Sequence, residues 1–229
     1  MIKFSVMPVL KKFFIDDENL SLKMIKRGMP PLGGGVIQFS CPVLKTVKAF
    51  QWLDVGKIKK IRGTAYTCRG PPNTSNRIIE SAKGEFLKYL PDVYFTVDNS
   101  KGLSPGKILW KLYSELFILK YYWDKLYNLD RSNLLSLLNI ILGFGICVYA
   151  ETNKGIFISA EAMKASEKGS ETSQKQPEDI GREAAWRLME EIWCSGCVDS
   201  YSQIFILLFM VLASRDVSKV SLGPLTTQT

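Results

Sequence analysis

The chain has 229 residues and a mass of 25.9 kDa, the size of one or two domains. Its apolar fraction of 46% and charged fraction of 23% are those of an ordinary globular protein and exclude a disordered chain. The sequence contains no histidine, which excludes Ser-His and Cys-His nucleophile pairs and His-containing metal sites within these residues. Any chemistry here must therefore use carboxylate, Lys, Tyr or Cys side chains.

The positive charge is concentrated in the first quarter of the chain. The net charge is +8, and residues 1–62 hold twelve Lys and Arg against four Asp and Glu, whereas the remainder is balanced. This distribution favours a phosphate-rich partner, with an anionic membrane surface and a merely solvated basic face as the alternatives. The five cysteines are scattered and no leader opens the chain, so we expect a reducing, intracellular compartment.

The first elements are expected around a glycine-rich loop. Residues 2–10 alternate between apolar and polar side chains, and the acidic cluster at 16–19 predicts a short helix or turn. Alternation over 20–26 predicts a strand, and Gly and Pro over 28–35 predict a loop. Residues 36–43 then predict a second strand of the same hairpin or sheet.

A strand, a helix and a strand are expected next. Residues 61–69 predict a strand that ends at two prolines, and residues 93–97 predict another. Between them, Asn73 or Thr74 is the expected cap of a helix, whose apolar positions recur at helical spacing: Ile78, Ile79, Ala82, Phe86, Leu87 and Leu90. The β-α-β order is typical of a compact α/β layer.

Residues 108–150 differ in character from the rest of the chain. Aromatic side chains crowd 108–127, and 132–150 is a run without a charge, close to the ~20 residues that span a bilayer. The polar Ser136 and Asn139 and the β-like end at 146–149 favour a buried helix followed by a strand. A membrane anchor through 132–150 stays an alternative.

The last third predicts a hairpin and two helices. A strand ending at Ala150 and another from Ile156 form the hairpin over 151–161, and a polar, mobile loop follows over 163–176. Pro177 begins a helix with one apolar face. Residues 201–213 are apolar nearly all round, which predicts a core helix, and 216–222 predict the start of a strand.

Cys194 and Cys197 form a Cys-x-x-Cys pair after Trp193. A redox pair needs its first Cys at the positive start of a helix, whereas here the helix precedes the pair. A zinc site would need a second pair, which the sequence does not contain. We therefore interpret the two as incidental thiols.

Two further groups of residues suggest contact with nucleic acid. Gly33, Gly34 and Gly35 beside Lys26 and Arg27 allow backbone N–H groups to approach a phosphate, although a tight turn explains the glycines equally well.

Arg215, Asp216 and Lys219 form the second group, a polar cluster capable of RNA cleavage without histidine. The simpler interpretation is a helix end with solvated charges.

The stretch from Arg27 to Ile37 reads Arg, Gly, two variable residues, Pro, one variable residue, three Gly, a variable and an aliphatic residue. It resembles the signature of the RNA 3'-terminal phosphate cyclase family. Shorter stretches are similar to the cyclase-like, ribosome-biogenesis branch of that family: 57–66, 76–82, 177–182, 196–200, 216–220 and 222–225.

The resemblance implies an α+β fold in which units of two helices on a four-stranded sheet repeat, incompletely here, around an inserted smaller α/β domain. On this basis residues 1–61 are the end of a repeat unit with the glycine loop, 62–165 the inserted domain, and 176–229 part of a further unit. Residues 108–142 lack a counterpart in the family pattern, and we interpret them as a foreign segment such as a retained intron.

The resemblance also implies a role in ribosomal RNA processing and small-subunit biogenesis in the nucleolus. The implied partners are pre-ribosomal RNA, a ribosome-biogenesis GTPase and the small-subunit processing complex, with no cofactor and no metal. True cyclases use a nucleophilic histidine that this sequence lacks, so we assign no catalytic residue for cyclisation and leave an RNA endonuclease role open. The residues expected to contact RNA are Lys26, Arg27, Gly33, Gly34, Gly35, Lys57, Lys59, Lys60 and Arg62. The alternatives are an active, ATP-dependent RNA 3'-terminal phosphate cyclase and a membrane-anchored protein.

Overall fold

The computed structural model describes residues 2–13, 19–28, 35–43, 46–68, 71–100, 143–164, 176–213 and 216–225. The aromatic-rich segment 108–142, most of the loop expected at 163–176 and Gly33 and Gly34 lie outside these ranges. Within them, no helix has both the length and the apolar character needed to cross a membrane.

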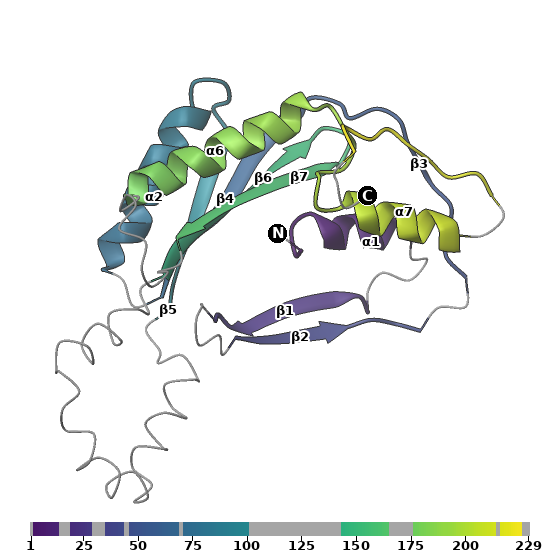
Figure 1. Cartoon of the computed structure of the whole chain (residues 1–229), viewed down its shortest axis with the longest axis horizontal. Coiled ribbons are helices and arrows are strands. Elements are labelled where there is room, and N and C mark those ends of the chain that lie inside the picture. The colour runs from purple at the N-terminus through teal and green to yellow at the C-terminus, as the bar shows by residue number, and fades with distance from the viewer. Residues whose placement is uncertain are drawn as a thin grey trace, which may run out of the picture.

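A four-stranded sheet with two helices on one face forms the centre of the molecule (Figure 1). The sheet order is β5-β4-β6-β7. The strands are β4 (Ile58–Cys68), β5 (Val93–Ser100), β6 (Gly143–Thr152) and β7 (Phe157–Lys164), and the helices are α2 (Pro72–Phe86) and α6 (Pro177–Trp193). Strands β4 and β5 are parallel, while β6 runs antiparallel to both β4 and β7. The expected β-α-β unit and the hairpin over 151–161 are therefore confirmed.

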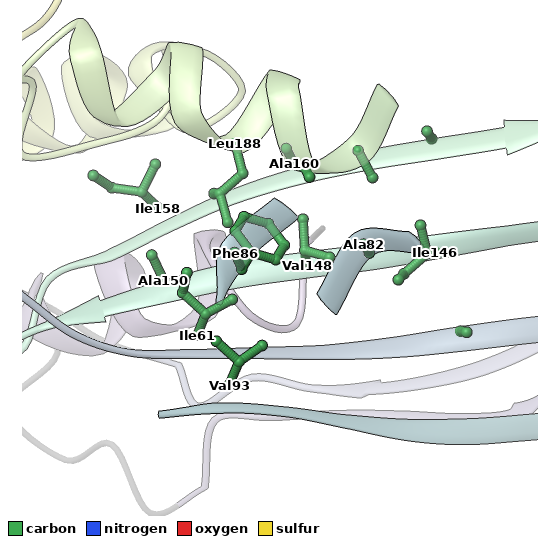
Figure 2. Packing of buried hydrophobic residues seen from close by; sticks show 14 of the residues in the cluster. Ile61, Ala82, Phe86, Val93, Ile146, Val148, Ala150, Ile158, Ala160 and Leu188 are labelled. Carbon is green, nitrogen blue, oxygen red and sulfur yellow. The ribbon is translucent and has the colours of Figure 1, made fainter. Parts of the chain in front are cut away.

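The core lies between this sheet and the two helices (Figure 2). Helix α2 contributes Phe86 and α6 contributes Leu188, which pack with Ile146 and Val148 of β6, and all four are at most 1% exposed. The two helices approach closely at Gly181, where a Cβ atom would collide with the Ser81 hydroxyl and the Ile78 carbonyl. A larger residue at this position would force the helices apart.

The helix starts differ from one another. Helix α2 begins with Pro72 after an N-cap at Pro71, so the expected cap at Asn73 or Thr74 was wrong. Proline suits the first helical position because its φ is already helical and its missing N–H is not needed there. Helix α6 begins at Pro177 as expected, and Gln176 and Asp179 form a capping box in which the Gln176 N–H donates to the Asp179 carboxylate at 3.0 Å.

The remaining elements lie beside this layer (Figure 1). They are α1 (Val6–Phe13), β1 (Ser21–Lys26), β2 (Val36–Ser40), β3 (Gln51–Trp52), α7 (Gln203–Leu212) and β8 (Lys219–Val220). Strands β1 and β2 form the expected antiparallel hairpin, and β3 pairs with β8 in parallel. The alternating apolar and polar residues over 2–10 do not form a strand. Residues 6–13 form helix α1, because Val6, Val9 and Phe13 share a buried helical face.

Helix α7 contradicts the expectation of a core helix. Only Gln203 and Ile206 are buried, whereas Leu208 is 54% and Val211 84% exposed. Apolar residues all round a helix become buried only where neighbours cover every side. Among the described residues, α7 packs through one side, against α1 and against a cluster that includes Phe50, Trp52 and Val220, while Leu208 and Val211 on its other side stay exposed.

The described residues thus form an α+β fold with one layer of two helices on a four-stranded sheet. Repetition of that unit stays a prediction, as do the domain bounds 1–61, 62–165 and 176–229. Helix α6 shares one buried cluster with helix α2 and with strands of the central sheet.

Candidate nucleic-acid interface

The face of the sheet opposite the helices carries the polar side chains of β4. Successive side chains on a strand point to opposite faces. Because Ile61 and Ala65 are buried beneath the helices, Lys60, Arg62 and Thr64 project from the other face. The first strand of the β-α-β unit therefore places two of the predicted RNA-contacting cations on the open side.

Both of these cations are held by carboxylates. The Arg62 guanidinium lies 2.8 Å from the Asp92 carboxylate and donates to the backbone carbonyls of Ile61 and Asp92 at 2.8 and 3.1 Å. The Lys60 ammonium lies 2.8 Å from the Glu151 carboxylate on β6. Partly exposed pairs of this kind contribute little stability, but three bonds fix the plane of Arg62.

Lys57 and Lys59 are exposed and contact no carboxylate within the described residues. The backbone of Lys57 is nonetheless fixed, because its N–H donates to the Asn153 side chain at 3.0 Å and its carbonyl accepts the Asn153 N–H at 2.9 Å. A rigid backbone with free ammonium groups suits contact with phosphates.

Arg27 makes contacts within the chain, and its predicted contact with RNA stays a prediction. Its Nε and a terminal nitrogen donate to one oxygen of Asp98 at 3.0 and 2.9 Å, and its guanidinium lies 4.1 Å from the centre of the Tyr66 ring. Burial raises the pKa of Tyr66 to about 12, with Glu161 adding to the shift and Arg27 opposing it. Arg27 thereby fastens the β1–β2 hairpin to the ends of β4 and β5.

The glycine loop is described only at its two ends. At Gly35 a Cβ atom would lie 2.9 Å from the backbone nitrogen of Gly28 and 3.3 Å from the carbonyl oxygen of Lys26. This crowding favours the tight-turn interpretation for Gly35, while Lys26 is exposed. Gly33 and Gly34 lie outside the described residues, so their part in phosphate binding stays a prediction.

The predicted RNA contacts do not form one site. Arg27 lies at the Tyr66 end of β4, whereas Lys57, Lys59 and Lys60 lie at or before its start. At 3.3 Å per residue, the nine residues from Lys57 to Tyr66 separate the two groups by about 30 Å. An RNA strand following β4 would be needed to contact both.

The predicted cleavage cluster is only partly described. Arg215 lies outside the described residues, Asp216 is exposed in a bend, and Lys219 is exposed on β8, where its N–H donates to the Phe50 carbonyl at 3.1 Å. Among the described residues, no group of three Cys, Asp or Glu has the arrangement of a metal site.

Sequence reasoning missed the acidic partners of the site. Asp98 and Asp92 lie 71 and 30 residues from the arginines they hold, and no local pattern reports such pairs. It also missed Asp199, which is 1% exposed and accepts the Ser159 N–H and hydroxyl at 3.0 and 2.8 Å. The only signal for Asp199 was its place in the family-like stretch 196–200.

The Cys-x-x-Cys pair lies after α6 as expected. Burial raises the pKa of the Cys197 thiol, the opposite of what a reactive thiolate needs.

Residues 53–193 match the model of the RNA 3'-terminal phosphate cyclase insert domain. The chain therefore belongs to the RNA 3'-terminal phosphate cyclase family. Among individual relatives, the mouse and human proteins named RNA 3'-terminal phosphate cyclase-like protein are each 42% identical over 229 residues, which cover 100% of this chain and 52% of theirs. The Schizosaccharomyces pombe rRNA processing protein rcl1 is 33% identical over 226 residues, covering 98% of this chain and 51% of that protein. The chain spans about half the length of these relatives.

Proposed function

We propose that this chain acts in ribosomal RNA processing during small-subunit biogenesis, contacting pre-ribosomal RNA in the nucleolus without cyclising RNA ends. The observation that carries the proposal is the similarity, over nearly the whole chain, to a fission-yeast protein named for rRNA processing. The cyclase-like names of the mouse and human relatives support the same branch. The proposed partners are a ribosome-biogenesis GTPase and the small-subunit processing complex.

The non-cyclising part of the proposal rests on the missing nucleophile. Cyclisation, as the family implies it, passes AMP from ATP to the RNA through a side chain that is unprotonated near pH 7. Imidazole meets this need with a pKa of about 6.5, and these 229 residues contain no histidine. A lysine would need a pKa several units below about 10.4, which requires burial, whereas Lys26, Lys57 and Lys59 are exposed.

Labelled ATP tests this part directly. The chain incubated with labelled ATP and magnesium is expected to carry no label after denaturation, and RNA 3'-phosphate ends are expected to stay open. A labelled band that survives denaturation would support the alternative of an active cyclase.

The RNA-contacting part rests on the free lysines at the start of β4. Binding through phosphates releases counterions, so affinity falls with salt, by a logarithmic slope of about 0.7 per neutralised phosphate on single strands. The double variant Lys57→Gln, Lys59→Gln is expected to lower this slope by about 1.4, or about 0.7 for each lysine, across unrelated RNA sequences.

A matched variant removes the same charge elsewhere. Lys83→Gln with Lys88→Gln changes two exposed lysines at the end of helix α2 and beyond it, away from the open face of the sheet. The slope of this control is expected to stay at the wild-type value. Equal slopes for all three proteins would show that Lys57 and Lys59 are only a solvated surface.

The partner part is tested in cells. A tagged copy of the chain recovered from nucleoli is expected to bring small-subunit rRNA precursors and a GTP-binding protein. Recovery of neither would contradict the proposed role.

A further inference from the structure

The face of the central sheet opposite the helices is covered mainly on its β6 and β7 half. On β6, the Tyr149 ring stacks on Phe4 with centroids 4.7 Å apart and planes 10° from parallel. On β7, Ser159 is bound by the buried Asp199, and the Ser5 hydroxyl lies 2.6 Å from that of Ser202. Residues 4–5 and the loop before α7 thus cover the β6 and β7 side.

Among the described residues, the β4 and β5 half is covered at its Tyr66 and Asp98 end, where Arg27 contacts both, while the part nearer the start of β4 stays open. Tyr94 on β5 is 62% exposed and is the register partner of Arg62 on β4. Two residues further along, the hydroxyls of Thr64 and Thr96 lie 2.8 Å apart in an exposed position. We name these four residues (Arg62, Thr64, Tyr94 and Thr96) the open strip.

The open strip combines the groups that bind single-stranded RNA on sheet surfaces. An exposed aromatic ring stacks any base, because every base has a π-face, and a fixed guanidinium beside it can pair with a phosphate. Threonine hydroxyls donate to and accept from ribose hydroxyls. The ring, the guanidinium and the two hydroxyls lie on one face of the adjacent strands β4 and β5, as the strand register requires.

The charges around the open strip are compatible with an anionic strand. The carboxylates nearest to it each hold a cation: Asp92 pairs with Arg62, Asp98 with Arg27, and Glu151 with Lys60. Lys57 and Lys59 then add unpaired positive charge at the start of the same strand β4. The electrostatic complement of this surface is therefore a polyanion.

We infer that the open strip binds single-stranded RNA, with one base stacked on the Tyr94 ring and the adjoining phosphate on Arg62. The inference rests on the proposed function, since it names the surface through which the RNA would be held. The base stacked on Tyr94 adds a contact that is independent of salt to the salt-dependent phosphate contacts of Arg62, Lys57 and Lys59.

Alanine and phenylalanine substitutions at Tyr94 separate stacking from hydrogen bonding. With a labelled oligouridylate as the probe, Tyr94→Ala is expected to weaken binding by about tenfold, because one stacked base is lost, whereas Tyr94→Phe keeps wild-type affinity. Tyr89→Ala is the matched control, since Tyr89 is 75% exposed in the turn after α2. The loss for Tyr94→Ala is expected to persist at every salt concentration, while that for Lys57→Gln with Lys59→Gln shrinks as salt rises.

A second measurement uses the unsubstituted chain and so does not depend on a variant folding. RNA carrying 5-bromouridine is cross-linked by light, and the attachment sites are mapped by mass spectrometry, with Tyr94 the expected site. Cross-links only at other residues would overturn the inference.

The outcomes distinguish the two proposals. If the chain binds RNA and Tyr94→Ala binds equally well, the open strip is not the RNA surface, whereas the proposed function stands. Equal weakening by Tyr94→Ala and Tyr94→Phe would show a hydroxyl contact and overturn stacking. If the chain binds no RNA at any salt concentration, both the inference and the RNA-contacting part of the proposed function fail.

Discussion

The central layer and the elements beside it differ in how completely they bury their apolar residues. In the layer, β4, β6, β7, α2 and α6 enclose one cluster in which Ile146, Val148 and Leu188 are fully buried. In the β1–β2 hairpin, register places Met24 beside Ile37 on one apolar face, yet these side chains are 47% and 65% exposed. The contrast shows that amphipathic pattern creates a face, while burial requires a second element to cover it.

Two phenylalanines test the contrast most strongly. Phe86 in α2 is 1% exposed and Phe39 in β2 is 57% exposed. Phe86→Ala is expected to lower the free energy of unfolding by about 3–5 kcal/mol, because it leaves a cavity in the packed layer. Phe39→Ala is expected to cost less than about 1 kcal/mol, since its ring has few neighbours to lose. Urea unfolding of both variants measures this, and equal losses would contradict the distinction.

Two glycines, one in each helix, test how closely helices α2 and α6 approach each other. Gly181→Ala is expected to destabilise the protein by about 1–3 kcal/mol, because its Cβ would collide with the backbone of α2 at Ile78. At Gly84 no atom lies within 4 Å of an added Cβ, so Gly84→Ala is expected to stabilise helix α2 by about 0.5–1 kcal/mol. Thermal unfolding of the two variants gives opposite signs if the helix contact is as close as described.

The contacts of Arg27 join the β1–β2 hairpin to the central layer, so a substitution at Arg27 tests how the two regions are held together. Arg27→Gln removes the bonds to Asp98 and the contact with the Tyr66 ring. Because the Asp98 side chain is 43% exposed, the loss in global stability is expected to be at most about 1 kcal/mol. Limited proteolysis is expected to cut the β1–β2 hairpin faster, whereas Lys26→Gln, which changes an exposed neighbour, leaves the cleavage rate unchanged. Equal rates for both variants would mean that Arg27 does not hold the hairpin.

Sequence reasoning was most accurate where local pattern and burial agree. Periodicity and proline placement predicted the strand over 61–69, found as part of β4, the helix with Ile78, Ala82 and Phe86, and the helix from Pro177. These predictions succeeded because neighbouring elements bury the face that the pattern marks. The exposure of α7 did not follow, since composition reports apolarity and not which neighbours are present. Register could not be read either, so the juxtaposition of Arg62 and Tyr94 came only from the fold.

The site was predicted by residue type and not by geometry. The lysines at the start of β4 were identified from charge, and so was Arg27, but its ion pair with Asp98, 71 residues away, was not foreseen. Such long-range pairs depend on which strands become neighbours, and the parallel pairing of β4 with β5 is what brings Tyr66 and Asp98 together. Charge patterns alone therefore overestimate the number of free cations.

The last expected effect lies at this same contact and appears only at high pH. Burial raises the pKa of Tyr66 to about 12 from 10.0, so the folded protein favours the neutral phenol. The stability that this provides is fully present below pH 10 and is lost as the pH rises from 10 through 12, because the unfolded chain ionises first. In a spectrophotometric titration of the folded protein, one of the nine tyrosines is expected to ionise near pH 12, and Tyr66→Phe removes that step alone. Glu161→Gln is expected to move the same step to lower pH, because the Glu161 charge opposes a phenolate nearby. Burial also raises the pKa of Tyr149, which therefore ionises late in both proteins. A step near pH 12 of unchanged amplitude in Tyr66→Phe would contradict the assignment to Tyr66.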